Sequence, residues 1–297
     1  MRKQLVKTIE DTLQNDPDLV LLLGDIGVYG FKEAFTDFPD RVYNIGILED
    51  ATVSVAAGLA KTNLIPVIHT IAPFLVERCY EQLKIDFGYQ SLGGNFISVG
   101  ASYDYASLGC THHCPGDVGI LQYIPGMEIY VPGSSQEFNT LFKEAYNNGK
   151  PSYFRLSERE NNASYSPKHG KASVIKNGEN LTVIAVGPVI DNVLRAMEDL
   201  DASILYYNSI SPFDKDTLQQ NISKTGKVLI VEPFYSGTTS RLVCEALSEL
   251  DIKNSIKSIG VPNKFLRSYG TAEDHDKAIG LSESYIHDFA KEFINVK

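Results

Sequence analysis

The sequence lacks three features that would assign it quickly to a class of protein. No run of about 18 apolar residues occurs, so no membrane span is expected. No basic block stands out, and the formal charge of −10 argues against a nucleic-acid partner. The first residues carry acidic side chains and no apolar core, so a secretory signal peptide is not expected either.

Cysteine is also scarce. The 4 cysteines stand at irregular positions, which argues against a disulfide framework and favours a reducing compartment, the cytoplasm. What is present is ordinary for a globular protein, with 43% hydrophobic and 22% charged residues. At about 150 residues per domain, 297 residues favour two domains.

Short apolar runs alternate with helical patterns along the first half of the chain. Continuous apolar strands, each followed by a helix, indicate a parallel sheet covered on both faces. The strands are predicted at 19–25, 41–47, 64–71, 95–101, 127–133 and 151–157, and the helices at 49–62, 74–90 and 134–149.

A polar stretch at 158–180 has the composition of a loop, and the alternation restarts after it. Further strands are predicted at 180–188, 203–210 and 227–233 and near 255–260. We therefore predict an α/β fold of two doubly wound domains, of which the second is smaller and mostly parallel. The predicted boundaries are 1–160 for the first domain, 161–178 for a linker and 179–297 for the second domain.

One segment after a predicted strand, GASYDYASLGCTHHCPGD, is rich in chemically active side chains. Ligands in doubly wound folds lie beyond the carboxyl ends of the strands, so this segment is a candidate site. Its cysteines and histidines are zinc-ligand types, but structural zinc sites join ligand pairs from separated segments, and no second pair occurs. A polar loop with incidental histidines is the alternative interpretation, and we expect no metal site here.

Glu49 opens the predicted helix directly after a strand, in RVYNIGILEDATVSVAAGLA. By itself, a carboxylate at a helix start indicates no more than a favourable interaction with the helix dipole. The complete pattern, however, resembles the pyrimidine-binding domain of thiamine-diphosphate enzymes of the transketolase family. Deoxyxylulose-phosphate synthase and the β subunits of 2-oxo acid dehydrogenases share it.

The resemblance continues in order along nearly the whole chain. LLLGDIG is similar to the family's first-strand turn, IPVIHTIAPFLVERCYEQLKID to its strand and R-x-Y-E-Q helix, and LGCTHHC to its Thr-His segment. TVIAVGP, ISPFDKDTL and GKVLIVEPFYSG resemble the transketolase C-terminal domain. The ordered set is more specific than any single motif in it.

The resemblance implies thiamine diphosphate as cofactor, with Glu49 as the acid hydrogen-bonded to its aminopyrimidine ring. A carboxyl group suits this role because burial and a partner tune its pKa. By the same resemblance, Asp25 lies at the cofactor and Phe74 stacks on the pyrimidine, with Tyr80 as the second candidate. Either aromatic side chain is equally compatible with a place in the core.

The substrate side is implied in the same way, and it departs from the family pattern. His112, with His113, matches the family histidine that contacts substrate oxygens, and Arg155 and Arg159 are candidates to receive an anionic acceptor. Three family positions are changed, where the chain has Gly100, Leu108 and Cys110. Because a lost hydrogen-bond partner discriminates strongly between substrates, these changes favour an unusual sugar or a pyruvate-like donor.

A complete transketolase also carries a Gly-Asp-Gly…Asn magnesium motif, which is absent here. The resemblance therefore implies a separate N-terminal, diphosphate-binding subunit that holds Mg²⁺, in an α2β2 heterotetramer. The expected activity is transfer of a two-carbon ketol or acyl unit from a ketose or 2-oxo donor to an aldehyde or sugar. The alternatives are a 2-oxo acid dehydrogenase β-like or deoxyxylulose-phosphate synthase-like decarboxylating subunit, and a non-catalytic assembly protein of the same fold.

Overall fold

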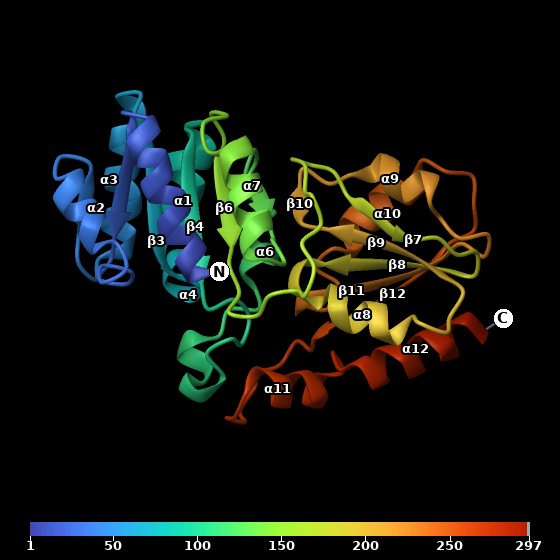
Figure 1. Ribbon diagram of the computed structural model, residues 1–297. Helices are drawn as coiled ribbons and strands as arrows, with labels where there is room; N and C mark the ends of the chain where they lie inside the picture. The colour runs from blue at the N-terminus through green and yellow to red at the C-terminus, as the bar shows by residue number, and fades with distance from the viewer. Residues whose placement is uncertain (296–297) are drawn as a thin grey trace.

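The computed structural model describes residues 1–295, and Figure 1 shows two sheets side by side, each covered by helices. The larger sheet of these residues is seven-stranded, in the order β10-β5-β6-β4-β3-β1-β2. Its strands are parallel except for β10, which pairs antiparallel with β5. They are β1 (Leu19–Leu23), β2 (Val42–Asn44), β3 (Ile65–Ile71), β4 (Gly94–Val99), β5 (Glu128–Tyr130), β6 (Pro151–Arg155) and β10 (Ser209–Ser211).

The second sheet has five strands within the described chain, in the order β12-β11-β8-β9-β7. It is parallel except for the edge strand β7, which pairs antiparallel with β9. The predicted fold class of two doubly wound, mostly parallel domains is confirmed. The strands are β7 (Ser173–Lys176), β8 (Leu181–Val186), β9 (Ala202–Tyr207), β11 (Lys227–Tyr235) and β12 (Ser255–Val261).

Helices bury both faces of the larger sheet, because successive strand residues point to opposite faces. Leu19, Leu21 and Leu23 pack in one core cluster with residues of α1 (Arg2–Asn15) and α7 (Ser135–Ala145). Val20 and Leu22 pack in the other with residues of α3 (Glu49–Lys61) and α6 (Asp117–Leu121). All of β1 is therefore buried, which explains its unbroken apolar sequence.

The second sheet is covered in the same way. Residues of α8 (Ile190–Ala196) and α12 (Glu283–Asn295) share a core cluster with β8, β9 and β11. On the other side lie α9 (Lys215–Gln220) and α10 (Ser240–Ser248), whose apolar residues join the cluster that also holds α3. The shorter α11 (Ala272–Ile279) lies below the junction of the two sheets in Figure 1. No helix within residues 1–295 is long and apolar enough to cross a bilayer.

The helix predicted over 74–90 is wrong in its continuity. The chain forms α4 (Ala72–Leu75), a turn, α5 (Tyr80–Gln82) and a π-helix over Leu83–Tyr89. The turn contains a hydrogen bond of the π-helical type, in which the Arg78 amide donates to the carbonyl of Pro73, five residues earlier, at 3.1 Å. Such widened turns often occur at functional sites, and this one places Arg78 beside Glu49.

Two further expectations about strands are also wrong. The stretch 158–180 is not all loop, because its residues 173–176 form β7. The strand predicted over 203–210 is divided at Asn208, so that β9 stays in the second sheet and β10 joins the first. The two sheets are therefore linked by backbone hydrogen bonds, including Val131 N–H to the Asn208 carbonyl at 2.8 Å. The boundary at 161–178 stays a prediction.

Candidate active site

Glu49 begins α3, just beyond the end of β2 at the carboxyl edge of the larger sheet. Its side chain is 4% exposed, and its Oε2 accepts a hydrogen bond from Arg78 Nη1 at 2.6 Å. The Arg78 side chain is 47% exposed, so one partner of this ion pair is in contact with water. Water can therefore hydrate the Arg78 head group when a ligand offers Glu49 another hydrogen-bond partner.

Two aromatic rings continue the site from Arg78. The guanidinium carbon of Arg78 lies 4.6 Å from the centroid of the Phe74 ring. Phe74 in turn contacts the His112 ring edge-on, with the centroids 5.5 Å apart. The Tyr105 ring also meets the His112 ring edge-on, with the centroids 6.2 Å apart. The structure thus brings together Glu49, Phe74 and His112, three predicted site residues from separate segments.

Asn44 fixes the turn that precedes Glu49. Its Oδ1 accepts from the backbone amides of Asp25 and Gly46, each at 3.0 Å, and its Nδ2 donates to the Asp25 carboxylate at 2.8 Å. Asp25 adopts a left-handed backbone with φ of 63°, which Asp tolerates better than most residues. Asp25 therefore lies at the site edge with its carboxylate held by Asn44.

Tyr80 and His113 have packing partners of their own. Tyr80 packs against the cluster on the α3 side of the sheet, with the Lys84 ammonium 5.9 Å from its ring centroid. His113 is buried and meets His275 of α11 edge-on at 5.7 Å. Burial lowers the pKa of His113, and the nearby His275 lowers it further. His113 is therefore directed toward α11 of the second domain, where its ring meets His275.

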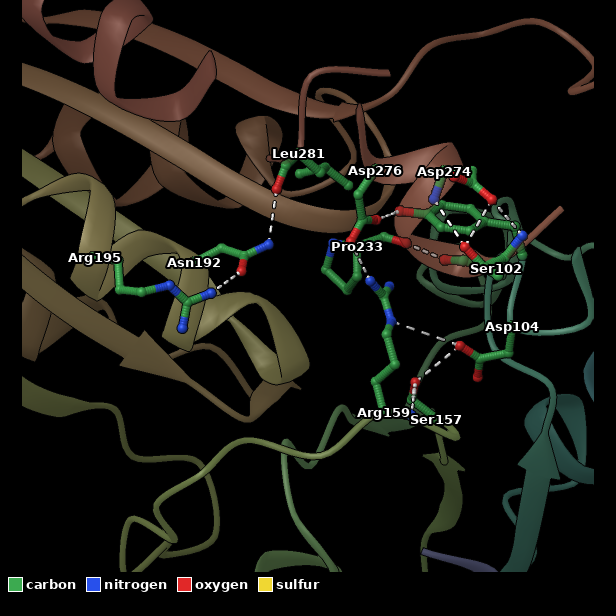
Figure 2. Close-up of polar contacts among 12 residues, drawn as sticks. Ser102, Asp104, Ser157, Arg159, Asn192, Arg195, Pro233, Asp274, Asp276 and Leu281 are labelled. Carbon is green, nitrogen blue, oxygen red and sulfur yellow. Dashed lines mark hydrogen bonds and ion pairs between the residues drawn. The ribbon is translucent and has the colours of Figure 1, made fainter. Parts of the chain in front are cut away.

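The two predicted anion-binding arginines both have carboxylate partners within the chain. Arg155 is 1% exposed and donates through Nε to Asp117 at 2.7 Å and through Nη2 to the Ser102 hydroxyl at 2.6 Å. Arg159 donates through Nη1 to Asp276 at 2.6 Å, and its Nε lies 3.9 Å from Asp104 (Figure 2). The structure thus places both arginines in ion pairs rather than beside Glu49.

A separate cavity of about 360 Å³ lies beside the site, between α1 and the turn after β1. It is lined by Arg2, Leu5, Val6, Asp25, Ile26, Gly27, Tyr29, Gly30, Phe31 and His69. His69 is buried, and its Nδ1 lies 2.9 Å from the Ile97 carbonyl, which requires the proton on Nδ1. Burial lowers the pKa of His69 to about 4, so the ring is neutral at pH 7.

Sequence reasoning did not assign roles to Arg78, Asn44 or Tyr105. Arg78 was visible in the R-x-Y-E-Q pattern. No motif marks Asn44, which contacts Asp25 across 19 positions, or Tyr105, whose ring meets His112 within the same loop. For the CTHHC segment, Cys110 is exposed and Cys114 is buried. Within residues 1–295 no three metal-ligating side chains converge.

Comparisons with known proteins define the family. The family model "Transketolase, pyrimidine binding domain" matches residues 1–163, and "Transketolase, C-terminal domain" matches residues 170–286. An "Uncharacterized 33.6 kDa protein in fasciation locus" of Rhodococcoides fascians is 37% identical over 97% of this chain and 92% of that protein. One of the subunits of an apulose-4-phosphate transketolase, from Actinobacillus succinogenes, is 27% identical over 96% of each chain.

Among solved structures, a split-gene transketolase described as an inactive β4 tetramer has a TM-score of 0.87 and 24% identity. The match covers 100% of this chain and 98% of that one, and it shows the shared fold. The fold is therefore that of a two-domain transketolase subunit. This chain belongs to the transketolase family, as the motifs implied, with the family's pyrimidine-binding and C-terminal domains. That family uses thiamine diphosphate in transferase-type chemistry.

Proposed function

We propose that the chain is one subunit of a thiamine-diphosphate-dependent enzyme that transfers a two-carbon ketol or acyl unit. The donor is a ketose or 2-oxo compound, and the acceptor is an aldehyde or sugar. The observation that carries the proposal is the series of contacts that joins three segments, from buried Glu49 through Arg78 and Phe74 to His112. The apulose-4-phosphate transketolase among the relatives supports the reaction class.

The residues around Glu49 fit the cofactor by their chemistry. A carboxyl group of 4% exposure is suited to share a proton with a ring nitrogen, and Phe74 offers a ring on which the pyrimidine would replace Arg78. Gly46, three residues before Glu49, leaves its side of the turn open, because a Cβ built there meets no atom within 4 Å. Asp25 and Tyr80 remain proposed cofactor contacts on the strength of the family resemblance.

When bound, the cofactor supplies the nucleophilic carbon and stabilises the charge that develops on the donor. Glu49 would hold its carboxyl proton toward the aminopyrimidine nitrogen, with Arg78 turned toward water. The Thr111 hydroxyl engages His112 Nδ1 at 2.9 Å, which leaves Nε2 for substrate oxygens.

We further propose that the chain acts only with a diphosphate-binding partner subunit. Next to Glu49, Ile47 and Leu48 are 68% and 56% exposed, so the site has an apolar border that a partner would cover. The partner would bind the diphosphate and Mg²⁺, and two copies of each chain would form an α2β2 assembly in the cytoplasm. The structural relative described as an inactive β4 tetramer agrees with a need for another type of chain.

Calorimetry of thiamine diphosphate with Mg²⁺ tests this proposal. The titration is made with the purified chain alone and with the chain co-expressed with a partner that carries the Gly-Asp-Gly…Asn motif. We expect tight binding only with the partner. Glu49→Gln in the complex should then lower turnover at least about a hundredfold, as expected for loss of acid–base catalysis.

Each other outcome of the calorimetry has a definite meaning. Tight binding by the chain alone would contradict the partner requirement. No binding in either preparation would contradict the cofactor proposal and favour the non-catalytic alternative. In a separate activity assay of the complex, consumption of pyruvate without an acceptor would favour the decarboxylating alternative.

A further inference from the structure

Of the two arginines at and just after the end of β6, Arg159 is the one that stays partly exposed. Arg155, four residues earlier, is 1% exposed and forms a buried ion pair with Asp117, whereas the Arg159 side chain is 25% exposed. A planar guanidinium in such a position is a ready site for phosphate or carboxylate. What already surrounds Arg159 therefore decides whether a charged substrate group is accepted there.

Two carboxylates of the chain itself surround Arg159 (Figure 2). Asp276, from α11 of the second domain, accepts from Nη1 at 2.6 Å, and Asp104, from the loop after β4, lies 3.9 Å from Nε. The Asp104 side chain is in turn held by the Ser157 hydroxyl at 3.0 Å and the Glu158 amide at 2.9 Å. With one cation between two anions, this cluster carries no positive charge to attract a substrate anion.

The Asp276 carboxylate is held in place from its other side as well. The Tyr103 hydroxyl donates to its Oδ1, and the Arg159 guanidinium lies 5.4 Å from the centroid of the Tyr103 ring. Tyr103 is buried and also contacts His275, the residue before Asp276, at 5.4 Å. Asp276 is thus a preorganised ligand of Arg159, and a free anion competes with it at an entropic disadvantage.

We propose that Asp276 takes the place of a substrate anion on Arg159, so that the acceptor of this enzyme carries an uncharged, hydroxylated end rather than a phosphate there. The uncharged end of the acceptor rests on the proposed transferase function. The occupation of Arg159 by Asp276 is independent of that function, because it concerns anion binding to the folded chain. Removal of the Asp276 charge should therefore create a phosphate site that the natural protein lacks.

The first test is calorimetric titration of inorganic phosphate into the full chain at constant ionic strength. Asp276→Asn keeps the shape and an acceptor oxygen for Tyr103, and it should bind phosphate roughly tenfold or more tightly than the natural protein, the scale of one charge-assisted hydrogen bond. Glu273→Gln is the matched control, because it removes an equal charge from the exposed face of the same helix. It should leave phosphate binding unchanged.

A double variant, Asp276→Asn with Arg159→Gln, locates the new site, since it should lose the gained affinity. Circular dichroism and thermal melting verify that each variant is folded. A folded Asp276→Asn protein without gained affinity would overturn the proposal. So would phosphate binding by the natural protein that Arg159→Gln abolishes, a result that does not depend on the folding of the Asp276 variant.

The second test uses the complex with the diphosphate-binding partner and a matched pair of acceptors, D-erythrose and D-erythrose 4-phosphate. The natural complex should have the lower KM for the unphosphorylated aldose, and Asp276→Asn should shift the KM ratio toward the phosphate ester. A natural preference for the ester that Arg159→Gln removes would overturn the inference. A complex inactive with every donor would contradict the proposed function, while the phosphate titration would still decide the role of Asp276.

Discussion

Two arginine–carboxylate pairs lie at the same edge of the larger sheet and differ in one respect, their access to water. In the Arg155–Asp117 pair both side chains are buried, at 1% and 0% exposure. In the Arg78–Glu49 pair the carboxylate is 4% exposed and the arginine 47%. The first pair cannot exchange partners without burying a bare charge, whereas in the second Arg78 reaches water when another group takes its place at Glu49. The same chemistry is thus structural in one pair and available for function in the other.

The buried Arg155–Asp117 pair should give the largest effect on stability. Arg155→Met removes the cation and leaves Asp117 buried with the Tyr153 hydroxyl as a hydrogen-bond donor. We expect a loss of about 3–5 kcal/mol in the free energy of unfolding, typical of breaking a buried ion pair, measured by urea denaturation. Adding Asp117→Leu should restore part of the loss. A change below about 1 kcal/mol would show that water reaches the pair in solution.

The burial of neutral His69 can be tested through the pH dependence of stability. Its folded pKa of about 4 lies below the ordinary value of 6.5, so the unfolded chain binds the extra proton between these values. Stability should therefore be complete above pH 6.5 and fall by about 3 kcal/mol as the pH drops toward 4. The variant His69→Leu carries no titrating ring, and the difference between its pH profile and that of the natural chain isolates this contribution. Identical slopes for the two proteins would contradict the burial of a neutral His69.

The Arg78–Glu49 pair, with its half-exposed arginine, should give the smallest effect on stability. Glu49→Gln removes the charge and keeps the shape, and Arg78 then turns to water. We expect the free energy of unfolding to stay within about 1 kcal/mol of the natural value, as for exposed ion pairs. Urea denaturation under the conditions used for Arg155→Met measures the contrast directly. A loss as large as that of Arg155→Met would erase the distinction between the two pairs.

Much of the fold was predictable because it depends on local patterns. The buried strands β1, β3 and β4 appear as apolar runs, and the helix that starts at Glu49 follows its strand as predicted. The π-helix over Leu83–Tyr89 and the passage of β10 into the first sheet were not predictable. Both depend on contacts with residues far away in the chain, such as β10 with β5.

The candidate site divides in the same way. The identities of Glu49, Phe74 and His112 follow from motifs, and their meeting is what the tertiary structure adds. Arg155 and Arg159 are alike in sequence as candidates for anion binding. Their difference in role depends on which carboxylates reach them.

By itself, the sequence determined the alternation of strands and helices, the family and the carboxylate that opens α3, since each rests on neighbouring residues. Only the tertiary structure decided which charges are satisfied within the chain. Asp117 reaches Arg155 across 38 positions and Asp276 reaches Arg159 across 117. The strength of an ion pair depends on distance in space and on burial, and neither is written in the spacing of residues along the chain.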